Sequence, residues 1–205
     1  MSVGLYDNAL VEKINNWTRN TPVTVLTPND TKSLLQILAD KGGDKPIELP
    51  IIALKRPGGF SIQRTGKSPL SFDGFTLDAT HEKASQLNAI PISIPYQIDV
   101  YTRYQNEADE YIRNLVFNII NYPKLQVTIP YNNENRIHDA NMKLSPDIED
   151  NSDIPERLVR GQFVRMTLRI DIDDAYLFDV RYRDVYSFTS STEIMDDDIK
   201  ADLKR

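Results

Sequence analysis

Cysteine is absent from this chain of 205 residues, and histidine occurs only twice, as His81 and His138. The first absence excludes disulfides, thiolate metal sites and a cysteine nucleophile. The two histidines stand apart in polar sequence, without the H-x-x-x-H or E-x-x-H spacing of metal and catalytic sites. We interpret them as loop residues, and many classes of enzyme are removed from consideration.

Long apolar runs are also missing. No run approaches the roughly 20 residues that a membrane-spanning helix needs. Residues 1–7 lack the basic and apolar regions of a signal peptide. We therefore expect a cytosolic protein with no membrane partner. The net charge of −6, from 24 basic and 30 acidic residues, gives no reason to expect a general affinity for nucleic acid.

The chain does have the balance of a globular protein, with 40% hydrophobic and 26% charged residues. Residues 90–104 show the clearest pattern, because polar and apolar side chains alternate with the period of a half-buried strand. One side of this strand is predicted to face a core. The apolar side holds Ile92, Ile94, Tyr96, Ile98 and Val100, and the other side includes Ser93, Gln97, Asp99, Tyr101 and Arg103.

A helix and a second strand are predicted to follow, up to residue 131. Asn106 stands where an N-cap would be, and the acidic residues after it suit the positive end of a helix dipole. Pro123 ends the helix, because proline disfavours helical geometry in the residue before it. The apolar stripe of the helix holds Tyr111, Ile112, Leu115, Val116, Ile119 and Ile120, and the strand alternates at Leu125, Val127 and Ile129.

The first helix is predicted around Leu10, Ile14 and Trp17, which have helical spacing. Asp7 or Asn8 is its expected N-cap. The apolar spacing predicts that this helix packs on the core.

Between that helix and residue 57 we predict a short strand at 23–26, a turn at 28–31 and a second helix that Gly42 ends. Residues 46–55 form an extended run. Pro50 interrupts it, which favours a sheet edge or a bulge.

Two polar stretches, 57–88 and 132–157, are predicted to be long loops. The first is rich in Gly, Ser, Pro and Thr, and short hairpin strands are expected within it around 60–62 and 75–77. The second is acidic. Alternating strands follow at 162–173 and 176–183, and the intervening Asp-Asp-Ala predicts a hairpin turn between them.

Together these elements predict a single α+β domain at 1–190. Its centre is a mixed, mainly antiparallel β-sheet packed against two or three helices. The last residues, 191–205, are predicted to form an acidic C-terminal tail.

Two segments have partial likeness to ligand-binding motifs. Gly66-Lys67-Ser68 resembles the end of a phosphate loop, but Ser61 stands where the first glycine is required. Residues 147–153 alternate carboxylates as a calcium loop does, but Ser152 occupies the position of the glycine that its sharp turn needs. We therefore expect no cofactor and no bound metal ion.

Residues 95–104, Pro-Tyr-Gln-Ile-Asp-Val-Tyr-Thr-Arg-Tyr, and the acidic helix after them resemble the tail terminator proteins of contractile-tailed bacteriophages, especially the tail-sheath stabiliser of T-even phages. The extended segment 46–51 and the polar loop, basic turn and strand at 150–171 are also similar to parts of that family. The middle loop is shorter than in the family, and the long C-terminal extension of the T-even members is missing.

The resemblance implies a non-enzymatic virion protein that forms a hexameric ring at the junction of tail and neck. Such a ring caps the tail tube and the last sheath ring, so its partners are the tube protein, the sheath protein and neck proteins. Assembly in the host cytoplasm is implied, as is passage of DNA through the ring lumen without specific recognition.

The residues themselves are compatible with a ring subunit, which needs two different complementary faces. Mixed charge on the outward strand faces favours contacts between subunits, and the alternative is an ordinary solvated sheet face. The candidate subunit-interface residues are Asp99, Tyr101, Arg103, Arg165, Arg169, Asp171, Arg181 and Arg183.

Two other functions stay open from the sequence. A head-completion or neck connector subunit would also form a ring, but it would bind the portal side. A metal-dependent phosphoesterase could use Asp171, Asp173 and Asp174, provided that these carboxylates converge on an ion.

Overall fold

The computed structural model describes residues 3–39, 49–63, 70–77, 83–131, 134–152 and 163–184. His81, the Gly66 motif and the acidic tail at 191–205 lie outside the described residues. The backbone alone is described at 34–39, 70–77, 83–88, 130–131, 134, 136 and 179–184.

The described strands form one eight-stranded sheet, and they are β1 (Thr24–Leu26), β2 (Ile51–Lys55), β3 (Ser61–Ile62), β4 (Leu70–Leu77), β5 (Lys83–Thr102), β6 (Lys124–Tyr131), β7 (Glu134–Asp150) and β8 (Val164–Asp184). The main order is β1-β2-β5-β8-β7-β6, and β3 and β4 also pair with β5. β1 and β2 are parallel, whereas the other pairs are antiparallel. The predicted α+β class with a mixed, mainly antiparallel sheet is confirmed.

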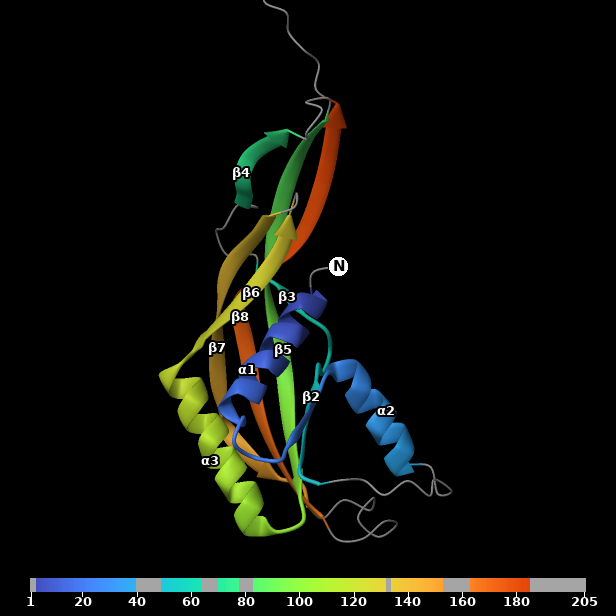
Figure 1. Cartoon of the computed structure of the whole chain (residues 1–205), viewed down its shortest axis with the longest axis vertical. Coiled ribbons are helices and arrows are strands. Elements are labelled where there is room, and N and C mark those ends of the chain that lie inside the picture. The colour runs from blue at the N-terminus through green and yellow to red at the C-terminus, as the bar shows by residue number, and fades with distance from the viewer. Residues whose placement is uncertain are drawn as a thin grey trace, which may run out of the picture.

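Helices α1 (Val3–Trp17) and α3 (Gln105–Asn121) pack on the same face of this sheet (Figure 1). α1 contacts β6, and α3 contacts β5, β7 and β8. The third helix, α2 (Pro28–Ala39), contacts β1 and β2 and stands at the opposite side of the molecule from α3. We call the face under α1 and α3 the inner face and its reverse the outer face.

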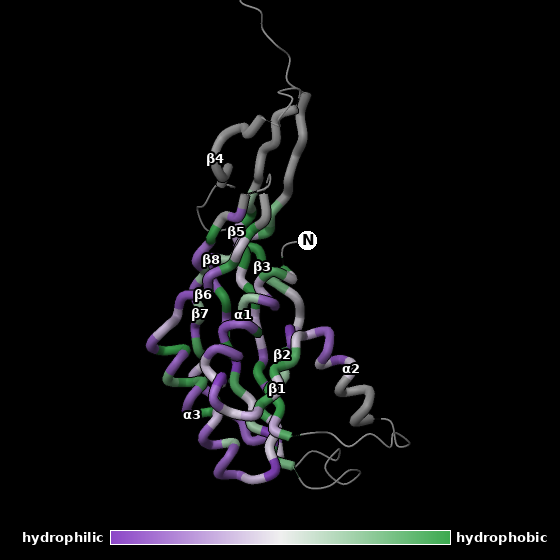
Figure 2. The backbone as a smooth tube through the Cα atoms, viewed as in Figure 1, coloured by the Kyte–Doolittle hydropathy of each residue, from purple (hydrophilic) through white to green (hydrophobic). Residues whose placement is uncertain are grey.

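The hydrophobic core lies between the inner face and these two helices. Figure 2 shows the apolar segments of the strands running behind α1. Removing such a side chain from water stabilises the fold by about 1.5–3 kcal/mol. The buried strand residues include Ile52, Leu54, Ile94, Tyr96, Ile98, Val100, Leu125, Val127, Leu168, Ile170 and Ile172, and the helices contribute Tyr6, Leu10, Ile14, Tyr111, Ile112, Leu115 and Ile119.

A β-bulge stands where the sequence predicted a hairpin turn. β5 and β8 pair from Lys83 with Asp184 to Thr102 with Val164, and their register shifts between Ile92 and Ile94. On β8 the extra residue is accommodated at Asp174, whose φ is 56°. The hairpin prediction is therefore wrong. Aspartate tolerates the left-handed backbone conformation, which suits a bulge as well as a turn.

Both predicted long loops contain strands. β4 and the start of β5 lie within residues 57–88, and β7 runs through much of residues 132–157. In β7 the inward positions Ala140 and Met142 alternate with polar residues on the outer face. The short strands predicted around 60–62 and 75–77 correspond to β3 and to the end of β4. The loop predictions are wrong for the start of β5 and for β7, because polar outward side chains masked a period of two.

Element boundaries also differ from the predictions. α1 begins at Val3, so Asp7 lies inside it, and α3 follows an N-cap at Tyr104 in place of Asn106. The predicted turn at 28–31 is the first turn of α2. Pro50 lies just before β2 and accepts a hydrogen bond from Thr24 N at 3.3 Å, so its missing N–H does not force β2 to a sheet edge.

Candidate functional site

Asp99 is the centre of a charged cluster on the outer face. Its side chain is fully buried, and its Oδ2 lies 2.7 Å from Lys55 Nζ and 3.1 Å from Arg165 Nη2. Thr167 donates a hydrogen bond to Oδ1 at 2.7 Å, and Gln97 donates another at 2.9 Å. Two cations and two neutral donors thus surround one carboxylate and join β2, β5 and β8.

The surroundings of Asp99 keep it ionised. Burial raises the pKa of its carboxyl group, but the hydrogen bond from Lys55 and the charge of Arg165 outweigh burial, so the pKa lies below its ordinary value. A buried carboxylate is tolerated only where such partners replace its lost hydration. Asp99 therefore acts within the chain, as a link between strands.

Tyr101 is buried beside this cluster, although the alternation predicts an outward residue at its position. Its ring centroid lies 5.8 Å from that of Phe163 and 5.7 Å from the guanidinium carbon of Arg165. Ile51 and Ala53 pack with it in a small second core on the outer face. Tyr101 therefore packs over Ile51 and Ala53 on the outer face of the sheet.

The remaining predicted interface residues are dispersed. Arg169 is half-exposed and pairs with Glu149, with Nη1 2.9 Å from Oε1. Arg103 and Asp171 are exposed, in the turn before α3 and on the outer face of β8. The side chains of Arg181 and Arg183 lie outside the described residues.

The structure thus brings Asp99, Tyr101 and Arg165 together, but inside one molecule. Asp99 and Tyr101 are both buried within the single chain, so neither lies on its surface. Alternation of polarity identified the correct face. It could not show that Asp99 and Tyr101 are buried on that face, because Lys55 and Phe163, which contact them, come from distant parts of the chain.

A polar link crosses the inner core as well, and sequence reasoning missed it. Tyr96 donates to Asp7 Oδ1 at 2.6 Å, and Arg56 Nε lies 3.2 Å from the same oxygen. Burial raises the pKa of the Tyr96 hydroxyl, and the negative charge of Asp7 raises it further. An acidic residue within the apolar spacing of Leu10 and Ile14 was the available signal.

Tyr6 supports the bulge in β8. Its hydroxyl accepts a hydrogen bond from Tyr176 N at 2.8 Å. Burial raises the pKa of Tyr6 to about 12. The tyrosine thus satisfies a backbone group next to the position where the β5–β8 register shifts.

The aspartates at the bulge are held by side chains of neighbouring strands. Asp173 Oδ2 lies 2.6 Å from Lys143 Nζ, and Ser93 donates to its Oδ1 at 2.8 Å. Asn141 donates to Asp174 at 2.8 Å. Within the described ranges, no three acidic or histidine side chains are grouped so that they could hold a metal ion.

The segment that resembles a calcium loop is also built differently from that motif. Asp147 and Glu149 belong to β7, which ends at Asp150. Asp150 Oδ1 accepts a hydrogen bond from Ser152 N at 3.0 Å, and Ser152 Oγ accepts one from Arg165 N at 3.2 Å. These residues therefore form the end of strand β7, where side-chain oxygens accept hydrogen bonds from backbone N–H groups.

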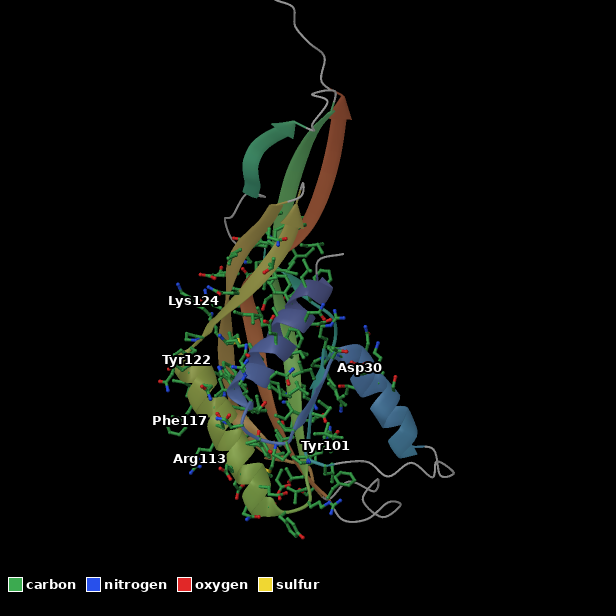
Figure 3. All side chains as sticks on the ribbon, in the orientation of Figure 1. Asp30, Tyr101, Arg113, Phe117, Tyr122 and Lys124 are labelled. Carbon is green, nitrogen blue, oxygen red and sulfur yellow. The ribbon has the colours of Figure 1, made fainter. Side chains whose placement is uncertain are left out.

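A second surface has the properties of a protein contact site, and we call it the α3 surface. It consists of Arg113, Phe117 and Ile120 on the helix row opposite the buried row, with Tyr122 just after the helix. Phe117 and Ile120 are each 62% exposed. In Figure 3, Arg113, Phe117 and Tyr122 point away from the body of the molecule. The prediction that Ile120 belongs to the buried stripe is wrong.

A groove and an open sheet edge adjoin the α3 surface. The groove has a volume of about 660 Å³ and runs between α1 and β6, with Lys13, Asn16, Tyr122 and Gln126 among its lining residues. Within the described residues, β6 pairs with β7 alone, so its other edge has unpaired backbone groups. Exposed aromatic residues, a groove and an open edge are together typical of a site for another polypeptide.

None of the helices in the described part of the chain is long and apolar enough to cross a membrane. No protein-family model matches the sequence, and no curated protein matches it.

Proposed function

We propose that this protein is a non-enzymatic virion component, a tail terminator that forms a hexameric ring on the end of a contractile tail. The ring would cap the tail tube and the last sheath ring and join the tail to the neck. The α3 surface carries this proposal, together with the resemblance of residues 95–104 to that family.

The α3 surface supports a ring because it lies at one side of the molecule. Phe117 and Ile120 leave apolar area in water, and β6, with its open edge, begins two residues after Tyr122. A heterologous contact joins such a side to a different side of the next copy, and it closes a ring when the rotation is right. Helix α2 and the short edge strand β1 form the opposite side.

The contacts at the bulge favour a structural role for its acidic residues. Asp173 and Asp174 are engaged by Lys143, Ser93 and Asn141, which join β5, β7 and β8. We therefore propose the tail terminator in preference to the phosphoesterase alternative.

The test is the absolute mass of the purified protein by light scattering over a concentration series, with negative-stain images. We expect six-subunit rings, and a double variant Phe117→Ser, Ile120→Ser that stays folded but no longer forms them. Ile137→Ser is the matched control, because Ile137 is also exposed but lies on β7, outside the α3 surface. A wild-type monomer that tube ends do not assemble would contradict the proposal.

A second experiment separates the terminator from a neck connector. The protein is incubated with purified tail tube and sheath and, separately, with portal complex. Capture by tube and sheath supports the terminator, whereas capture by the portal alone contradicts it.

A further inference from the structure

A separate pocket opens between the start of α2 and the end of β2. Its volume is about 410 Å³, and Gln97 of β5 forms part of its wall. The charged residues that line it are Lys32, Lys55 and Arg56, and no carboxylate is among its described lining residues. The chain as a whole is acidic, whereas the charged residues that line this pocket are all positive.

The N-terminus of α2, which is the positive end of the helix dipole, borders this pocket. Thr27 is the N-cap, because Asp30 N donates to its Oγ1 at 3.3 Å and Thr31 N donates to its carbonyl at 2.9 Å. Pro28 occupies the first helical position, and both Pro28 and Asn29 line the pocket. The aligned backbone dipoles of such a turn favour a negative charge.

Thr31 is the most informative residue of the pocket. It is 1% exposed and lines the pocket, and its buried hydroxyl has no hydrogen-bond partner in the described structure. A buried hydroxyl without a partner destabilises a protein, so this group requires a partner from outside the described chain. An oxyanion in the pocket would accept its hydrogen bond.

Two of these cations form ion pairs with buried carboxylates, which fix their positions. Lys55 pairs with the buried Asp99 at 2.7 Å, and Arg56 pairs with the buried Asp7 at 3.2 Å. Asp99 also pairs with Arg165, so this carboxylate is shared by two cations. Lys32 is exposed at the pocket rim. Lys55 and Arg56 are therefore positioned before any ligand arrives. The single charge of Asp99 cannot neutralise both Lys55 and Arg165.

We propose that this pocket binds a phosphate group, as inorganic phosphate or a small phosphomonoester. Donors approach from several directions, namely the hydroxyl of Thr31 and the cations Lys32, Lys55 and Arg56. The dipole of α2 adds a favourable field for an anion. A tetrahedral dianion with four oxygens uses such an arrangement better than a planar carboxylate does. The pocket lies apart from the α3 surface, and the inference does not depend on the proposed function.

Isothermal titration calorimetry of the full chain with inorganic phosphate tests the proposal, with chloride keeping the ionic strength constant. Saturable binding is expected, and acetate at the same concentration should bind at least about tenfold more weakly, the difference that about 1.4 kcal/mol produces. A phosphomonoester such as glycerol phosphate forms a third arm. Tighter binding of the ester than of phosphate would identify the ester as the preferred ligand form.

Thr31→Val gives the sharpest variant, because a structural and a binding role predict opposite results. If the hydroxyl serves phosphate, the variant unfolds at the same or a higher temperature without phosphate and binds phosphate about tenfold more weakly. Lys32→Ala should also weaken binding. Lys124→Ala is the matched control, because it removes the same charge from an exposed site on β6 and should leave binding unchanged.

Three results would overturn the proposal. These are the absence of saturable heat at millimolar phosphate, equal binding of acetate, and unchanged affinity in both Thr31→Val and Lys32→Ala. General stabilisation by excluded anions would raise the unfolding temperature of all variants alike, so it is distinguished by the Lys124→Ala control.

Discussion

Single side chains on this sheet act mainly as links between strands. Asp99 shows this most clearly, since one carboxylate contacts Lys55 of β2 and both Arg165 and Thr167 of β8. The sequence shows an aspartate at position 99, but its two cationic partners, Lys55 and Arg165, each lie more than forty positions away. A period of two predicts the face on which a residue lies, and it carries no information about which distant residue covers it.

Asp99→Asn should destabilise the protein by about 3 kcal/mol at neutral pH, because Lys55 and Arg165 lose their shared charge partner. The folded pKa of Asp99 is depressed, so its contribution is present above the unfolded pKa of about 4 and is lost as the pH falls through the lower folded value. Urea unfolding at several pH values measures this. The difference between wild type and variant should shrink in acid, and a constant difference would contradict the assignment.

Tyr6→Phe should cost about 1–3 kcal/mol at neutral pH, because Tyr176 N loses its hydrogen-bond acceptor. The pKa of Tyr6 is raised to about 12, so its contribution is complete below the unfolded value of about 10 and is lost as the pH rises through the folded value. The two proteins should therefore converge in stability as the pH rises from 10 to 12. Thermal unfolding across that range is the measurement.

At the scale of elements, strands were harder to predict than helices. The sequence predicts three helices in the right order, and α3 packs through most of the stripe that its periodicity indicates. β7 and the start of β5 were predicted as loops, because a strand that pairs on both sides can hold many polar residues on an open face. Phe117 was visible as an apolar residue outside the stripe, and this signal could have revealed the α3 surface.

Asp174 has a positive φ of 56° at the bulge in β8. Asp174→Ala should destabilise the protein by about 1–2 kcal/mol, because alanine is strained at a φ of 56° and cannot accept the hydrogen bond from Asn141. Asp174→Gly loses that bond but relieves the strain, so its cost should be smaller. Urea midpoints of the two variants decide the order, and an equal cost would show that backbone strain is unimportant there.

At the scale of the whole molecule, the buried and exposed sides of α3 allow the fold and the proposed assembly to be tested separately. Leu115 is fully buried, whereas Phe117 on the same helix is exposed. Leu115→Ala should lower the free energy of unfolding by about 2–5 kcal/mol. Phe117→Ala should change it by no more than about 0.5 kcal/mol in the dissociated chain, while weakening the proposed ring. Denaturant unfolding at low protein concentration and light scattering at high concentration measure the two effects separately.

The long pairing of β5 with β8 has a mechanical consequence. The two strands continue beyond α1 and α3 at one end of the molecule (Figure 1), and their register extends from one end of β5 to the other. Antiparallel hydrogen bonds stand perpendicular to the strands. A force that pulls the two strands in opposite directions along their length loads these bonds together, in shear, whereas peeling would break them one after another. The β5–β8 pair should therefore resist a force along its strands better than a force that peels the strands apart.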